Sequence, residues 1–146
     1  VAELANECKN IVAIKEATGS IEQMIKIKEL CGDRIAILSG EDHLILPMLS
    51  IGATGVVSVV ANIMPRDMAD LIKAFETKNF NTAFDLHSKL YDVSRNMFIE
   101  GNPVTVKTAM KILGLVENDD VRLPLVSSEQ KTIDKLIKLF QSKELI

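Results

Sequence analysis

Three short apolar runs, each followed by a helical pattern, constrain the fold of this chain more than any other feature. The runs read IVAI over 11–14, IAIL over 35–38 and VVSVV over 56–60. Unbroken runs that are rich in β-branched residues are typical of strands buried on both faces. A strand–helix repeat requires parallel strands joined by right-handed crossovers. The sequence therefore predicts an α/β fold with a parallel sheet.

Helix start and stop signals lie between these runs. Ser20 and Gln23 form a capping-box pair, which predicts a helix that runs to about Cys31 and ends at Gly32. Pro65 fits the first turn of the helix after the third run, because its missing N–H costs nothing there.

Residues 79–146 carry helical patterns only. Three helices are expected, over 79–98, from Pro103 to Gly114, and from Ser127 or Ser128 onward. We therefore divide the chain into residues 1–78, which hold the strand–helix units, and residues 79–146, a helical segment.

Composition excludes several classes of protein. Lys and Arg total 17 against 20 for Asp and Glu, a net charge of -3 that argues against nucleic-acid binding. No apolar stretch reaches the ~18–20 residues that cross a bilayer, so no membrane association is expected. Cys8 and Cys31 are too few for a disulfide framework and indicate reduced thiols in a cytoplasmic protein.

The first residues already follow a helical stripe. Val1, Leu4, Ala5 and Cys8 share one face, and no capping residue precedes them. A chain that opens inside a helix suggests the C-terminal part of something longer, and this is our expectation for the sequence.

Lys15 is the candidate with the clearest chemistry. It follows four apolar residues at the carboxyl end of the first strand, where parallel α/β folds bind ligands. A half-buried amine loses proton affinity, and only a neutral amine attacks a carbonyl to form a Schiff base. From the residues alone, a lysine that merely extends into solvent at the strand end remains an open interpretation, because such lysines are common.

Other polar groups favour structural roles. Glu41 and Asp42 suit the first turn of a helix, where the helix dipole stabilises acidic side chains. His43 and His87 lie far apart in the sequence and lack the spacing of metal ligands, so no metal site is expected.

Five segments together resemble the dihydrodipicolinate synthases, members of the pyruvate-dependent aldolase family that includes the N-acetylneuraminate lyases. They follow the family's order over almost the whole chain, and EATG with the NP-x-x-VK segment favours the dihydrodipicolinate branch. The segments are IVAIKEATG (11–19), SGED (39–42), GATGVVSVVAN (52–62), the NP-x-x-VK segment within 100–115, and RLPL (122–125).

The resemblance implies the C-terminal portion of a (β/α)8 TIM barrel, with the last three βα units in 1–78 and a C-terminal helical segment in 79–146. It implies a lyase of lysine (diaminopimelate) biosynthesis that condenses pyruvate with aspartate semialdehyde to 4-hydroxy-tetrahydrodipicolinate. Lys15 would be the catalytic Schiff-base lysine, and Gly40 and Val57 would bind substrate largely through backbone atoms. Neither a metal nor an organic cofactor would be needed.

The resemblance also implies partners and limits. The family's threonine pair, tyrosine proton relay and substrate arginine have no counterparts here, so we expect the chain alone to be nearly inactive without an N-terminal half of the barrel. Family members are commonly cytoplasmic homotetramers. Two alternatives stay open: a lyase for N-acetylneuraminate or another keto-sugar acid, and a non-catalytic half-barrel that serves as an assembly module.

Overall fold

The computed structural model describes all 146 residues and contains three strands, seven α-helices and two 3-10 helices. The strands are β1 (Ala13–Glu16), β2 (Ala36–Ser39) and β3 (Gly55–Val56). The α-helices are α1 (Ala2–Glu7), α2 (Ile21–Cys31), α3 (Ile45–Ser50), α4 (Pro65–Glu76), α5 (Phe80–Asn96), α6 (Val104–Ile112) and α7 (Gln130–Ser142). The 3-10 helices are η1 (Asp42–Leu44) and η2 (Val60–Asn62).

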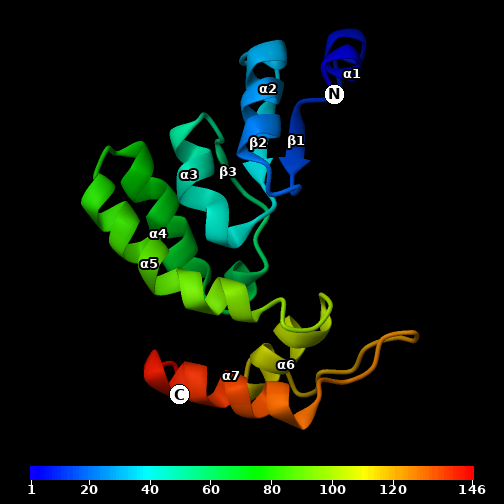
Figure 1. The fold of residues 1–146 in the computed structure, drawn as a ribbon, viewed down its shortest axis with the longest axis vertical. Helices are drawn as coiled ribbons and strands as arrows, with labels where there is room; N and C mark the ends of the chain where they lie inside the picture. The colour runs from blue at the N-terminus through cyan, green and yellow to red at the C-terminus, as the bar shows by residue number, and fades with distance from the viewer. The chain divides into compact units, whose positions relative to one another are not determined.

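The strands form one parallel sheet in the order β1-β2-β3, with β1 at one edge (Figure 1). Lys15 pairs with Leu38, and Leu38 pairs with Gly55. The predicted parallel sheet is confirmed, but each strand is displaced from its apolar run. The third strand is much shorter than the run at 56–60, because its partner β2 ends at Ser39. The Ser39 carbonyl accepts the hydrogen bond from the Val57 N–H, the last one between the two segments.

The helix signals operate at the expected residues, with one difference. The Ser20 hydroxyl accepts a hydrogen bond from the Gln23 N–H at 3.1 Å, and α2 ends at Gly32 with φ of 58°. The Gln23 side chain does not close the capping box, because it donates to Glu16 instead. Pro65 is the first residue of α4, as predicted.

The chain divides into two units, each described here by itself. The first comprises Val1–Ser58 with Asp70–His87, and the second comprises Val59–Ala69 with Ser88–Ile146. In the first unit α2 packs its apolar face on the sheet. The buried cluster consists of Met24, Ile27, Cys31, Ile35, Ile37, Met48 and Ala53.

Helices α6 and α7 pack together in the second unit. Leu136 and Phe140 of α7 are fully buried. The Asn102–Pro103 and Leu123–Pro124 peptide bonds are cis. Pro103 is the N-cap of α6, and α7 begins two residues later than Ser128, because the chain is still extended at Glu129.

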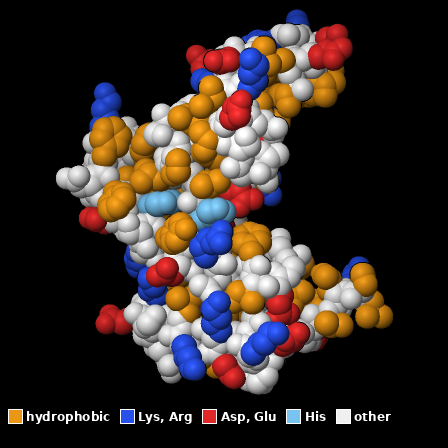
Figure 2. Space-filling model, viewed as in Figure 1, with side chains coloured by type: hydrophobic (Ala, Val, Ile, Leu, Met, Phe, Trp, Pro, Cys, Tyr) orange, Lys and Arg blue, Asp and Glu red, His pale blue; other side chains and the backbone are white.

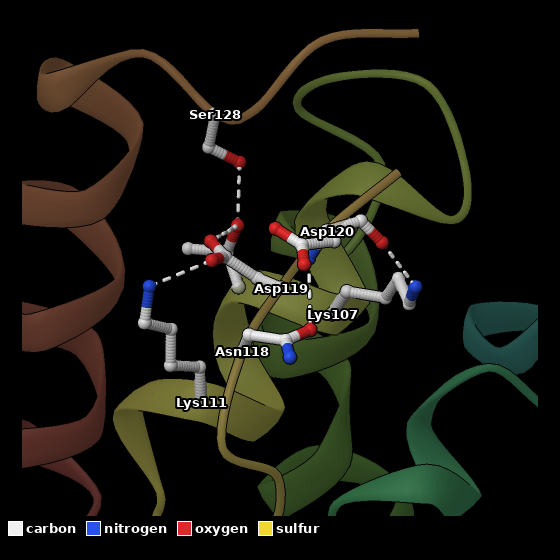
Figure 3. A network of polar contacts seen from close by, with 7 residues as sticks. Lys107, Lys111, Asn118, Asp119, Asp120 and Ser128 are labelled. Carbon is white, nitrogen blue, oxygen red and sulfur yellow. Dashed lines mark hydrogen bonds and ion pairs between the residues drawn. The ribbon is translucent and has the colours of Figure 1, made fainter. Parts of the chain in front are cut away.

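The segment between α6 and α7 is tied to α6 by polar contacts (Figure 3). Asp119 accepts hydrogen bonds from Thr108 at 3.0 Å and from Lys111 at 2.7 Å. Thr108 also bonds to Ser128 at 2.8 Å, and Lys107 donates to the carbonyl of Asp120.

No helix is long and apolar enough to traverse a bilayer. The fold is thus α/β, a three-stranded parallel sheet followed by helices.

Candidate functional site

Lys15 lies on β1 with its side chain on the face opposite α2. The residues of β1 alternate in burial, so that Ile14 packs toward the core and Glu16 is 2% exposed, whereas Ala13 and Lys15 are exposed. The expectation that this strand is buried on both faces and that Lys15 is half-buried is therefore wrong for the chain by itself. The physical reason is that β1 is an edge strand, and no element of the chain covers the face that Lys15 occupies.

Gly40 lies against the lysine. A Cβ placed on Gly40 would come within 2.4 Å of the Ala17 Cβ and 2.8 Å of the Lys15 Cε, distances far inside van der Waals contact. The Gly40 N–H donates to the carbonyl of Glu16 at 2.6 Å, which holds the two backbones together. Only a residue without a side chain at position 40 leaves room for the observed position of the Lys15 side chain.

Val57 directly follows β3, as Gly40 directly follows β2. The Val57 N–H donates to the carbonyl of Ser39 at 2.8 Å, which places it beside the end of β2. Because Leu38 pairs with both Lys15 and Gly55, these three residues fall on one face of the sheet. Val57 is 44% exposed. The fold therefore brings Lys15, Gly40 and Val57 together at the carboxyl ends of three adjacent strands.

Glu16 is a buried polar residue that the sequence patterns do not single out. Its Oε1 accepts hydrogen bonds from the Thr18 N–H at 3.0 Å, the Thr18 hydroxyl at 2.5 Å and the Gln23 side-chain amide at 3.0 Å. These bonds close the turn between β1 and α2. The only signal in the sequence is an acidic residue just beyond an apolar run, which is too common to identify such a role.

An open cavity of about 540 Å³ borders β1 on the outer side of the first unit. Its lining is mostly apolar and comes from α1, β1 and α2, with Lys15, Glu16 and Gln23 among the polar contributors. The cavity thus contacts both Lys15 and Glu16, which lie on opposite faces of β1.

The two histidines lie closer together than their sequence separation indicates. Burial, and secondarily the nearby His43, lower the pKa of His87 below its ordinary value. His43 also faces Glu41, with 3.5 Å between Nδ1 and Oε2. Figure 2 shows both histidines, in pale blue, side by side on one surface. No group of three or more His, Cys, Asp or Glu side chains has the arrangement of a metal site.

Comparisons with known proteins show which family the chain is similar to. The sequence profile of the Dihydrodipicolinate synthetase family matches residues 1–143. Over 146 residues the chain is 49% identical to the 4-hydroxy-tetrahydrodipicolinate synthases of Geotalea daltonii and of Geobacter sulfurreducens, covering 100% of this chain and 50% of each relative.

Solved structures show the same likeness. The dihydrodipicolinate synthase of Aquifex aeolicus superposes with a TM-score of 0.94 at 40% identity, over 99% of this chain and 49% of that one. The enzyme of Thermotoga maritima gives a TM-score of 0.94 at 32% identity, over 99% of this chain and 50% of that one. The chain spans about half the length of the curated relatives it matches. It belongs to the dihydrodipicolinate synthetase family.

Proposed function

We propose that this chain supplies the Schiff-base lysine of a 4-hydroxy-tetrahydrodipicolinate synthase, a lyase of lysine biosynthesis that condenses pyruvate with aspartate semialdehyde. The observation that carries the proposal is the position of Lys15 at the carboxyl end of a parallel strand, directly against Gly40, with Val57 at the end of β3. Membership of the dihydrodipicolinate synthetase family and the names of the relatives support the choice of reaction.

In the proposed mechanism the Lys15 amine adds to the keto carbon of pyruvate, and loss of water gives an imine. Loss of a methyl proton from the pyruvyl group then gives an enamine, whose carbon attacks the aldehyde of aspartate semialdehyde. The amine of the semialdehyde displaces Lys15 in the last step, which closes the ring and frees the enzyme. The imine is the electron sink, so the reaction requires neither a metal nor an organic cofactor.

Gly40 and Val57 are proposed to bind pyruvate. Gly40 lies directly against the Lys15 stem, so its backbone would border a small keto acid that is bound to the amine. Val57, at the end of β3, has a short apolar side chain that is partly exposed. Neither contact uses a charged side chain, so the role of both residues is to shape the site.

The proposal assigns residues 1–78 to the last three βα units of a (β/α)8 barrel and residues 79–146 to the helical segment that follows. The half of the relatives that this chain does not cover would then supply the N-terminal part of the barrel. Two features support a barrel built from two parts. No strand pairs with β1 on the side away from β2, and Lys15 is exposed.

The isolated chain is proposed to be nearly inactive. Groups that move protons in the transition state commonly contribute about 10²–10⁴-fold, and the family's proton relay has no counterpart among these residues. We further propose that the complete enzyme is a cytoplasmic homo-oligomer, a tetramer by analogy with the family.

Trapping with borohydride tests the proposed function. The chain is co-expressed with the half of the Geobacter sulfurreducens enzyme that it does not cover, and the complex is treated with pyruvate and borohydride. We expect mass spectrometry to find a reduced pyruvyl adduct on Lys15, abolished in Lys15→Arg and retained in Lys26→Arg, which alters another lysine of the same cavity.

Two results bear on the alternatives. An adduct on a different lysine, or none in a well-formed complex, contradicts the proposal and favours a non-catalytic assembly module. If the adduct forms, turnover with aspartate semialdehyde is compared with turnover of other aldehydes. Faster turnover of a sugar aldehyde would assign the chain to the keto-sugar acid lyases instead.

A further inference from the structure

Glu16 is a buried acidic residue directly beside Lys15 in the sequence, and the mechanism above gives it no task. It is 2% exposed, on the face of β1 opposite to the lysine. A carboxyl group is rarely buried so fully without several hydrogen-bond partners. The partners of its two oxygens therefore bear on its role.

Oxygen Oε1 is fully used within the chain. It accepts three hydrogen bonds, from the N–H and hydroxyl of Thr18 and from the Gln23 side chain. Gln23 in turn is held at the start of α2 through the Ser20 cap. This half of the carboxyl group fixes the turn that leads from the lysine strand into the next helix.

Oxygen Oε2 has no hydrogen-bond partner within the chain, although it is buried. A buried polar atom without a partner costs about 1–3 kcal/mol relative to one that is hydrogen-bonded. The three donors that reach the carboxyl group all bond to Oε1, which leaves Oε2 without a donor from this chain. One oxygen of the carboxyl group is therefore satisfied within the chain, and the other is buried without a partner.

Glu16 borders space that residues outside this chain can occupy. Glu16 lines the 540 Å³ cavity between α1, β1 and α2, and β1 has no strand on its outer side. The relatives of this chain are about twice its length, so a complete enzyme holds further residues that this cavity can receive.

We propose that Glu16 is a positioning residue for Lys15 whose Oε2 accepts a hydrogen bond from a donor side chain in the half of the enzyme outside these 146 residues. The inference rests on the proposed function. Lys15 and Glu16 are consecutive residues of one strand, so anchoring the carboxyl group at both oxygens fixes the rotation of β1. That rotation aims the amine toward Gly40 and the substrate. The contact makes the orientation of the lysine depend on the presence of the other half.

Glu16→Gln isolates the contact of Oε2. The amide oxygen can replace Oε1 and keep the three bonds of the turn, whereas the NH₂ group replaces Oε2 and cannot accept a hydrogen bond. Glu22→Gln is the matched control, because Glu22 is an exposed residue in the first turn of α2.

The first measurement compares unfolding in urea for the chain alone and for its complex with the other half of the Geobacter sulfurreducens enzyme. In the chain alone we expect the Glu16→Gln midpoint to equal or exceed that of the wild type, because Oε2 has no partner to lose. In the complex we expect a lower midpoint for the variant. Equal effects in both settings overturn the proposal, since the donor would then be water or a group of this chain.

The second measurement concerns positioning in the folded complex. Misplacement of a reacting group by about 1 Å can cost about 10²-fold in rate. We therefore expect Glu16→Gln to lower kcat and the rate of pyruvate trapping by about 10- to 100-fold while the KM for pyruvate changes less than threefold. Glu22→Gln should match the wild type. A purely structural role would lower stability and leave kcat per folded molecule unchanged, which would overturn the proposal.

The outcomes separate this proposal from the function on which it rests. If the wild-type complex forms no adduct on Lys15, the proposed function fails, and the two urea comparisons alone decide whether Oε2 contacts the other half. If the wild type and Glu16→Gln form the adduct at equal rates, the function stands and the positioning role of Glu16 falls.

Discussion

At the scale of single residues, the candidate site depends on the close approach of two backbones. Gly40 has no side chain, and the stem of Lys15 together with Ala17 occupies the space where a Cβ would lie. The hydrogen bond from Gly40 to the carbonyl of Glu16 keeps the strands at this distance. The glycine thus serves packing and the candidate site at once, because any substituent presses on the lysine itself.

Gly40→Ala tests this close approach. The new methyl group would overlap with Ala17, whose Cα lies 3.0 Å away and cannot move without the strand, so we expect a loss of about 1–3 kcal/mol in the free energy of unfolding. Urea denaturation of the chain measures the loss. Gly101→Ala is the matched control, because a Cβ there meets nothing within 4 Å, and its stability should stay within about 0.5 kcal/mol of the wild type. Equal stability of the two variants would contradict the packing described here.

The residues of the site were predictable to different degrees. Lys15 followed from a polar group at the end of an apolar run, and Gly40 and Val57 followed from the family resemblance alone. The exposure of Lys15 did not follow, because burial at an edge strand depends on neighbours that the local sequence does not describe. Glu16 was missed because its partners Thr18 and Gln23 become meaningful only when the turn is folded.

At the scale of elements, the signals for the start and end of α2 and for the start of α4 were accurate. The Ser20 cap, Gly32 and Pro65 each act at the predicted residue. The strand boundaries were less accurate, because a strand extends only as far as its partner does. Of the run at 56–60, only Val56 belongs to β3, and Val57 adds one hydrogen bond to Ser39 at the end of β2.

The segment between α6 and α7 has almost no helix or strand of its own and depends on side-chain contacts. Asp119 is its centre, since its two carboxyl oxygens accept from Lys111 and from Thr108 (Figure 3). The hydrogen bond from Lys111, followed by that from Thr108, lowers the pKa of Asp119 below its ordinary value, against the opposing effect of burial. The folded state thus stabilises the charged form of this carboxyl group.

Asp119→Asn tests the contribution of this network and its pH dependence. Lys111 is 51% exposed, so its ion pair contributes under about 1 kcal/mol, and the bond to Thr108 adds about 1 kcal/mol. We expect the variant to lose about 1–2 kcal/mol at pH 7. A lowered folded pKa gives stability that is complete above the unfolded pKa of about 3.9 and is lost as the pH falls through the folded pKa.

The difference between the wild type and Asp119→Asn should therefore be constant from pH 7 to about 5 and shrink below about pH 4. Urea denaturation at each pH provides the measurement. Asp120→Asn is the control, because the network uses only the backbone of Asp120 and its side chain is exposed. A difference that persists unchanged at pH 3 would show that the charge of Asp119 does not matter.

At the scale of the whole molecule, β1 is an edge strand that carries Lys15, and the side of β1 away from β2 pairs with no strand. The carbonyls of Val12 and Glu16 accept hydrogen bonds from Ala36 and Gly40 on the side of β2. Because successive peptide groups of a strand face opposite sides, those of Ala13 and Lys15 face the open edge. An unpaired edge is a template for a further strand, and the proposed barrel would supply one.

Hydrogen exchange at β1 tests whether the other half of the enzyme pairs with this edge. In the chain alone we expect the amides of Ala13 and Lys15 to exchange rapidly, whereas those of Ile14 and Glu16 are protected by β2. Addition of the other half of the Geobacter sulfurreducens enzyme should slow exchange at Ala13 and Lys15 by at least about tenfold, because both gain a strand partner. Protection that instead rises with the concentration of the chain alone would mean that a second copy covers the edge. The lysine would then be buried in a self-associated form, and the assembly of a barrel around β1 would be contradicted.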